Sequence, residues 1–163
     1  MHVYRLAGIA LSVASSACGR TTAHQDPAPR AAPRGTSQRL VGRWALVTLV
    51  RNGEDLTNRS AVTVGATVFY NFNADGTFRI VRGDSIRETG TWSQDTSVSP
   101  KLFDHIPDVD GRPGPFVPGI FAMSGDSLTI SIIPPNPTRR HPTAFRSTPA
   151  DSSWLLVFRR PDR

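Results

Sequence analysis

The chain contains a single cysteine and a single lysine. Cys18 and Lys101 are the only residues of these two types among 163. Because there is no second cysteine and no closely spaced histidine pair, we predict no metal site, even if His105 and His141 come together in the fold. The other eighteen basic residues are arginines, scattered singly or in pairs rather than gathered on one stripe with interleaved aromatics. We therefore predict no nucleic-acid partner, despite a formal net charge of +6.

Catalytic motifs are also missing. The sequence has no Gly-x-Ser-x-Gly, no His-Glu-x-x-His, no paired-carboxylate motif and no phosphate-cradling glycine loop. Asp108 and Asp110 stand close to Asp104 and His105, but they lack the ligand spacing and the terminal glutamate of a calcium loop. A solvated acidic loop is the simpler interpretation. The sequence thus predicts a protein that is not an enzyme and that needs no cofactor or metal.

No apolar run is long enough to cross a membrane as a helix. The N-terminal run, Leu6 to Ala14, follows the positive charge of Arg5 and precedes small residues, which is the pattern of an export signal. The residues before Cys18 resemble the lipobox of bacterial lipoproteins, in which the cysteine thiol is lipidated and becomes the mature N-terminus. Ser15 stands where that motif usually has leucine, so ordinary cleavage without lipidation is the alternative.

We accordingly divide the chain into a signal peptide over residues 1–17, a tether rich in proline, alanine and arginine over 18–38, and one domain over 39–163. A lipidated Cys18 would anchor the protein stably, because several acyl chains add their burial energies. Gly19 after the cysteine favours the outer membrane, by resemblance to such lipoproteins. The expected location is therefore the cell envelope, at the periplasmic face of the outer membrane.

From residue 40 onward, short β-rich runs alternate with turn signals and no helical stretch stands out. Asn-Gly at 52–53 and Asp-Gly at 75–76 supply the positive φ that tight turns need. Residues 94–116 carry four prolines and predict a long irregular connection, with at most a short strand at 101–106. The expected strands lie near residues 40–50, 62–72, 77–82, 86–93, 117–123, 127–133, 143–146 and 153–160. We predict an all-β fold, an antiparallel up-and-down barrel of about eight or nine strands.

The two ends of the domain predict how this barrel closes. Gly42 and Trp44 open the first strand, and the last strand ends at Arg160. Because side chains alternate along a strand, Arg160 shares a face with Phe158, whereas Arg159 points the other way. We expect the guanidinium of Arg160 to stack on the indole of Trp44, a structural closure and not a binding site.

Several short motifs recur in a characteristic order along the domain. They are Gly42-Arg43-Trp44, Phe72-Asn73-Ala74-Asp75-Gly76-Thr77-Phe78, Glu88-Thr89-Gly90-Thr91-Trp92-Ser93, Pro118-Gly119-Ile120-Phe121, Gly125-Asp126-Ser127-Leu128-Thr129-Ile130, Pro142 with Phe145, and Leu156 with Phe158 and Arg160. In this order they resemble the lipocalin-like domains of uncharacterised bacterial secreted proteins, an exported or lipoprotein subgroup. Together they cover residues 40–160; one departure is His141, where the subgroup tends to have arginine. The resemblance implies a calycin-type barrel with no settled activity and no transferable site residues.

An eight-stranded barrel either fills its interior with side chains or leaves room for one small ligand. We select Tyr70, Phe72, Phe78 and Ile80 as the candidate lining of a ligand cavity. The expected function is a monomeric barrel that binds a small apolar or amphipathic molecule at its open mouth. The alternative is a ligand-free envelope module that contacts a protein partner through its long loops. A calyx of about 300 Å³ or more would favour the ligand.

Glu88 is the one strand acid that the pattern places on a face with Ile86 and Trp92. If that face points inward, the carboxylate needs a partner, since burying an unpaired charge is costly. The candidate partners are Arg79, Arg82 and Arg160. The alternative is that barrel curvature or a local bulge turns Glu88 to solvent. A third possible function, an enzyme, would need a polar cluster inside the barrel. Glu88 and these arginines are the only residues in the sequence that suggest one.

Overall fold

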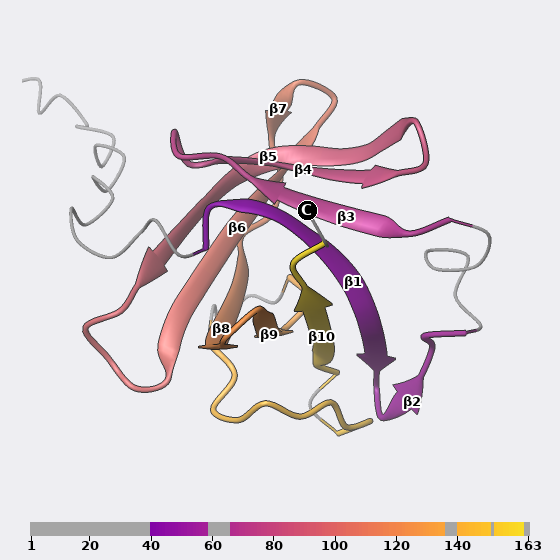
Figure 1. The fold of residues 1–163 in the computed structure, drawn as a ribbon. Coiled ribbons are helices and arrows are strands. Elements are labelled where there is room, and N and C mark those ends of the chain that lie inside the picture. Colours follow the sequence, from indigo (N-terminus) through magenta and orange to yellow (C-terminus); the bar gives the residue numbers. More distant parts are fainter. Residues whose placement is uncertain (1–39, 59–65, 136–139, 151, 162–163) are drawn as a thin grey trace, which may run out of the picture. The chain divides into compact units, whose positions relative to one another are not determined.

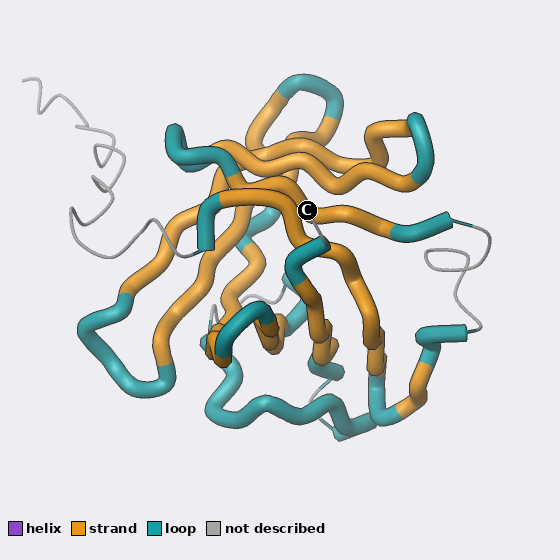
Figure 2. Tube along the Cα trace, in the orientation of Figure 1, coloured by secondary structure: helices purple, strands orange, loops and turns teal. Residues whose placement is uncertain are grey.

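The computed structural model describes residues 40–58, 66–135, 140–150 and 152–161. The predicted signal peptide, Cys18 and the tether lie outside these ranges, so their roles stay predictions. Within the described ranges the chain forms ten β-strands. It forms no helix there, and Figure 2 shows strands and loops only. The described residues accordingly contain no helix of the length and apolar character needed to cross a membrane.

Eight of the ten strands form one closed antiparallel barrel. The strands are β1 (Gly42–Arg51), β2 (Glu54–Asp55), β3 (Val68–Phe72), β4 (Thr77–Arg82), β5 (Ser85–Asp95), β6 (Lys101–Val109), β7 (Arg112–Pro113), β8 (Val117–Ser124), β9 (Ser127–Ile132) and β10 (Trp154–Arg159). The order around the barrel is β1, β3, β4, β5, β6, β8, β9 and β10, and β10 pairs with β1 to close the ring (Figure 1). The two-residue strands β2 and β7 lie outside this ring. They pair antiparallel with the ends of β1 and β6, respectively. The predicted all-β antiparallel barrel is confirmed.

The turns between strands form where the sequence predicts them. Asn52 and Gly53 have φ angles of 53° and 81°, as a tight Asn-Gly turn requires. Gly76 has a φ of 83° in the turn between β3 and β4. In that turn the Asp75 carboxylate accepts hydrogen bonds from the Thr77 hydroxyl at 2.7 Å and the Thr77 amide at 2.8 Å. These bonds from Thr77 lower the pKa of Asp75 and fix the start of β4.

Two sequence predictions about strands are wrong. Residues 94–116 are not mostly irregular, because β6 runs through them and pairs with β5 on one side and β8 on the other. Pro107 is accommodated at the last β5–β6 pair, opposite Gly90, where the ladder ends and a missing N–H is tolerated. The short strand expected at 143–146 is absent from the described residues 140–150.

Two bulges change which side chains face the interior. In β1 the pairing with β10 shifts between Leu46 and Thr48, so Leu46 and Leu49 are both buried while Val47 is 40% exposed. In β5 the pairing with β4 skips one residue before Glu88. Ile86 is therefore 57% exposed, and the expectation that it shares a face with Glu88 is wrong.

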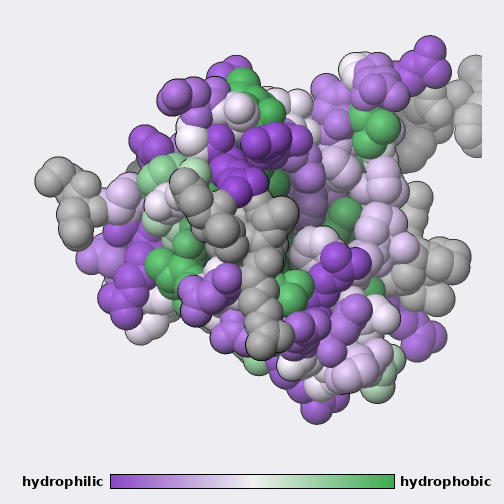
Figure 3. Space-filling view, turned by 90° about the vertical axis from the view of Figure 1, so that its right-hand side faces the viewer, coloured by the Kyte–Doolittle hydropathy of each residue, from purple (hydrophilic) through white to green (hydrophobic). Residues whose placement is uncertain are grey.

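One end of the barrel interior is filled with aromatic side chains. The Phe72 ring packs edge-on against Trp92 at 5.4 Å and against Phe103 at 5.6 Å between centroids. Trp44 and Phe158 are both 0% exposed. Outside, hydrophilic residues dominate the face in Figure 3, and hydrophobic surface appears between them only as small patches. The core of the domain is thus the inside of the barrel.

The same end is sealed by the predicted closure. The Arg160 Cζ atom lies 4.1 Å from the centroid of the Trp44 ring, and Arg160 Nη2 donates a hydrogen bond to the Val41 carbonyl at 3.1 Å. The indole Nε1 of Trp44 donates to the Leu40 carbonyl at 2.8 Å. Gly42 leaves space for the guanidinium, since a Cβ there would overlap Arg160 Nη1. The opposite end of the barrel is its mouth.

Candidate functional site

The barrel is hollow toward its mouth, in two connected parts. The inner cavity has a volume of about 70 Å³ and the mouth pocket one of about 410 Å³. The inner cavity is lined by Tyr70, Phe72, Phe78, Ile80, Glu88, Phe103, His105, Ile130, Ile132, Trp154, Leu156 and Phe158. The mouth pocket is lined by Leu46, Leu49, Val68, Tyr70, Ile80, Arg82, Arg87, Glu88, Trp154 and Leu156. Five residues belong to both linings, so the smaller space continues into the larger one.

All four residues selected from the sequence line the inner cavity. Tyr70 and Ile80 also line the mouth pocket, whereas Phe72 and Phe78 lie deeper. Tyr70 packs against Phe158 with ring centroids 4.8 Å apart, which fixes the phenol at the border of the two spaces. That these four side chains contact a ligand stays a prediction.

Strand register brings three lining residues into one row. Tyr70 of β3 stands opposite Ile80 of β4, and Ile80 stands opposite Glu88 of β5. Residues directly opposite each other in an antiparallel pair project from the same face of the sheet. The phenol of Tyr70 and the carboxylate of Glu88 therefore lie on either side of an apolar isoleucine, and all three face the interior.

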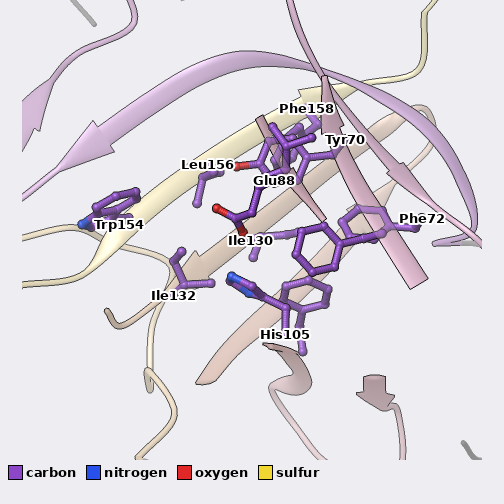
Figure 4. A pocket seen from close by; sticks show the side chains of 12 residues that line it. Tyr70, Phe72, Glu88, His105, Ile130, Ile132, Trp154, Leu156 and Phe158 are labelled. Atoms are coloured by element: carbon purple, nitrogen blue, oxygen red, sulfur yellow. The ribbon is translucent and has the colours of Figure 1, made fainter. Parts of the chain in front are cut away.

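Glu88 points into the barrel, as Figure 4 shows, and not to solvent. Burial raises the pKa of its carboxyl group, and no described cation forms an ion pair with it. Of the three arginines considered as partners, Arg160 stacks on Trp44 at the closed end and Arg79 is exposed on an outer groove. Only Arg82 shares the mouth pocket with Glu88. The bulge in β5 exists, but it exposes Ile86 and leaves Glu88 facing in.

His105 is a second polar side chain in the inner cavity. It lies on β6, and its ring packs against Phe78 at 5.5 Å and Phe103 at 5.8 Å between centroids. Its Nδ1 atom is buried and has no hydrogen-bond partner among the described residues. Burial lowers the pKa of His105 to about 4, so the imidazole is neutral at pH 7. In Figure 4 the ring nitrogens of His105 and the carboxylate of Glu88 point into the same space.

The phenol of Tyr70 completes the polar part of the lining. Burial, and then the negative charge of Glu88, raise the pKa of Tyr70 well above its usual range. The hydroxyl is therefore protonated at neutral pH. Tyr70, Glu88 and His105 come from three different strands and form the polar part of this lining. Of the polar residues that the sequence suggested for the interior, Glu88 lines the inner cavity and the three arginines do not.

Sequence reasoning missed His105, Trp154 and Leu156 as lining residues. The sequence predicts a solvated acidic loop around His105, with at most a short strand at 101–106, because prolines are frequent in this segment. For Trp154 and Leu156 a signal was available, since both share the parity of Phe158 and Arg160 along the last strand. The pairing of β6 with β5 and β8 brings His105 to the cavity, and the pairing of β10 with β1 and β9 brings Trp154 and Leu156 there.

The two histidines considered as metal ligands do not converge. His105 points into the barrel, whereas the neighbouring Asp104 points out and its Oδ1 lies 2.6 Å from His141 Nε2. Successive residues of a strand project from opposite faces, so β6 separates the two imidazoles. The described residues contain no group of three or more His, Cys, Asp or Glu side chains arranged to hold a metal ion.

Arginines stand at the rim of the mouth. Arg82 and Arg87 belong to the mouth lining. The guanidinium of Arg51 lies over the ring of Trp154, with Cζ 4.8 Å from the centroid. The rim thus carries positive charge, while the carboxylate of Glu88 lies below it, at the entrance to the inner cavity.

A scan against protein-family models, a search of curated proteins and a search of solved structures each found no match for this chain. A closed barrel alone does not identify a lipocalin family. The resemblance drawn from the short motifs therefore stays a prediction, and any function has to be argued from the site.

Proposed function

We propose that this protein is an exported, lipid-anchored, lipocalin-like barrel that binds one small amphipathic molecule. The observation that carries the proposal is a mouth pocket of about 410 Å³ that opens above a mainly apolar inner cavity holding three polar groups, Tyr70, Glu88 and His105. Ligand pockets of proteins typically measure about 300–1,000 Å³ and combine apolar walls with a few polar groups. Leu46, Leu49, Val68 and Leu156 supply the apolar walls here, and Glu88 is one of the polar groups.

The distribution of packing supports the same proposal. Aromatic side chains fill the barrel at the Trp44 end, so a ligand enters only from the mouth. A barrel selected only as a rigid scaffold would gain stability from filling the mouth half with side chains as well, because empty apolar space costs dispersion contacts. The unfilled half is where a ligand would replace those contacts.

Native mass spectrometry of the full-length protein, purified from cells that express it, tests this function. We expect a stoichiometric adduct that is released on denaturation and can then be identified. Ile80→Trp places a large side chain across the border of the two spaces and should abolish the adduct. Ile86→Trp is the matched control, because Ile86 is 57% exposed outside the cavity. A ligand-free mass, reproduced after exposure to an envelope lipid extract, would overturn the proposal.

A second candidate function is binding of a protein partner, and one observation favours it. The β6–β7 hairpin and the outer faces of β4 and β5 border an outer groove of about 540 Å³. Val109, in this hairpin, is 51% exposed, and Ile86 is exposed in the β4–β5 hairpin. A stoichiometric protein partner released by Val109→Asp and retained by Ile80→Trp would favour this function over ligand carriage.

A further inference from the structure

Among the residues that the structure describes, the inner cavity presents three hydrogen-bond acceptors and no charged donor. The Glu88 carboxylate, the Tyr70 hydroxyl oxygen and the imidazole of His105 all line it. The carboxylate has no described cationic partner, and the buried Nδ1 of His105 has no hydrogen-bond partner. With the proton of the neutral imidazole on Nε2, Nδ1 is an acceptor. Unsatisfied buried polar groups are costly, so a ligand that satisfies them gains affinity.

We propose that this cavity holds the protonated amino group of the ligand, a primary amine carried on an apolar body. A primary ammonium group has three donors and no acceptor, which matches the three acceptor groups from β3, β5 and β6 that line this cavity. The inference rests on the proposed ligand-binding function and specifies the class of ligand.

The volume of the inner cavity is consistent with a ligand whose polar group is an amino group rather than a larger charged group. A water molecule occupies about 30 Å³ in the liquid, so a cavity of about 70 Å³ takes an ammonium group and its first methylene. A trimethylammonium group is larger than this space. The aromatic rings of Phe72, Phe78 and Phe103 border the same cavity and favour a cation over an anion.

The rim restricts the rest of the ligand. Arg82 and Arg87 line the mouth pocket above Glu88 and repel a second positive charge there. The body of the ligand is therefore neutral or acidic, and a polyamine is excluded. Its apolar surface lies against Leu46, Leu49 and Leu156. The titratable and charged groups that line the two spaces together with Glu88 are thus Tyr70, His105, Arg82 and Arg87.

Calorimetric titration of the full-length protein, stripped of any bound ligand, with n-octylamine, 1-octanol and octanoate at pH 7 tests the inference. We expect n-octylamine to bind most tightly, because only its head group can satisfy three acceptors. Glu88→Gln should weaken n-octylamine roughly tenfold or more, since it removes the opposite charge, and should leave 1-octanol nearly unchanged. Asp84→Asn, which neutralises an exposed carboxylate in the β4–β5 turn, is the matched control and should change neither affinity.

A stability measurement separates recognition from a structural role of Glu88. If Glu88 serves the ligand, Glu88→Gln raises the urea midpoint of the ligand-free protein at pH 7, because it removes a half-buried charge without a partner. A lower midpoint, or equal binding of n-octylamine by the wild type and Glu88→Gln, overturns the inference. Tighter binding of octanoate than of n-octylamine also overturns it and leaves the proposed function standing. Only the absence of any small molecule, in titration and in native mass spectra, removes the proposed function as well.

Discussion

The guanidinium of Arg160, just after β10, lies over the indole of Trp44 near the start of β1, with Cζ 4.1 Å from the ring centroid. Arg160 also donates a hydrogen bond to the Val41 carbonyl. Since β1 and β10 are the pair that closes the barrel, this stack joins the two ends of the domain and seals the end opposite the mouth.

Arg160→Ala should lower the free energy of unfolding by about 1–2 kcal/mol, because it removes the cation–π contact and a hydrogen bond from a desolvated site. Arg159→Ala is the control. Arg159 is exposed on the other face of the chain, so we expect a change within about 0.5 kcal/mol. Urea unfolding followed by tryptophan fluorescence measures both. Equal losses in the two variants would show that the stack contributes nothing specific.

Gly42→Ala should destabilise the protein more than Gly83→Ala. Both glycines have positive φ, 124° and 56°, and so both variants strain the backbone. Only at Gly42 does the new Cβ also overlap the Arg160 guanidinium, whereas at Gly83 nothing lies within 4 Å. The double variant Gly42→Ala with Arg160→Ala should therefore lose less stability than the sum of the two single variants. Additive losses in urea unfolding would contradict the close approach of Gly42 and Arg160.

The free energy of unfolding should decrease as the pH is lowered from about 6.5 to about 4, because His105 is buried in its neutral form. Its pKa is about 4 in the folded protein against an ordinary value of 6.5, so the unfolded chain binds the extra proton first. One such group gives a slope of up to about 1.4 kcal/mol per pH unit, with stability present at higher pH and lost on acidification.

Glu88 has the opposite effect on the pH dependence of stability. Burial raises its pKa in the folded protein, so its protonation on acidification stabilises the fold. The change in the free energy of unfolding per pH unit should therefore be measured by urea unfolding in the Glu88→Gln variant, with and without the second substitution His105→Gln. We expect His105→Gln to make this pH dependence weaker. An unchanged slope would mean that His105 is solvated and titrates normally in the folded protein.

Asp104→Ala should cost about 1 kcal/mol, since it removes the 2.6 Å contact with His141 Nε2 from a pair of side chains that are 25% and 26% exposed. The loss should be larger than for Asp108→Ala, whose carboxylate is exposed at the end of β6. The pair connects β6 to the segment 140–150 outside the barrel. Faster proteolysis within that segment in Asp104→Ala, but not in Asp108→Ala, would show that the contact holds it in place.

Local sequence patterns were sufficient for much of the fold. Asn-Gly and Asp-Gly turns require positive φ whatever surrounds them, so the turns at Asn52 and Asp75 are set by their own residues. The alternation of side chains between the two faces of an unbroken strand also depends only on neighbouring residues. It predicts that Arg160 and Phe158 lie on the same face. Tyr70 and Ile80 lie on strands that alternate in the same way, but only the strand register places both on the interior face.

The prolines explain the missed strand. A proline cannot donate to a ladder, so the segment containing Pro107 reads as irregular when its partners are unknown. In the barrel Pro107 stands at the end of the β5–β6 ladder, and its carbonyl accepts a hydrogen bond from the Gly114 amide at 2.7 Å. His105 was misplaced for the same reason, because only the pairing of β6 with β5 and β8 makes it an interior residue.

The sequence by itself determined the strands that alternate without interruption and their turns, because each depends on a few adjacent residues or on parity alone. The closing contact of Arg160 with Trp44 was predicted from the two ends of the domain, but it forms only because β10 pairs with β1. Tertiary structure decided that Glu88 and His105 point into one cavity, and that the mouth half of the barrel stays open. A bulge shifts parity without a sequence signal of its own, as Ile86 shows. The volume left between eight strands depends on all their side chains together, which no local pattern contains.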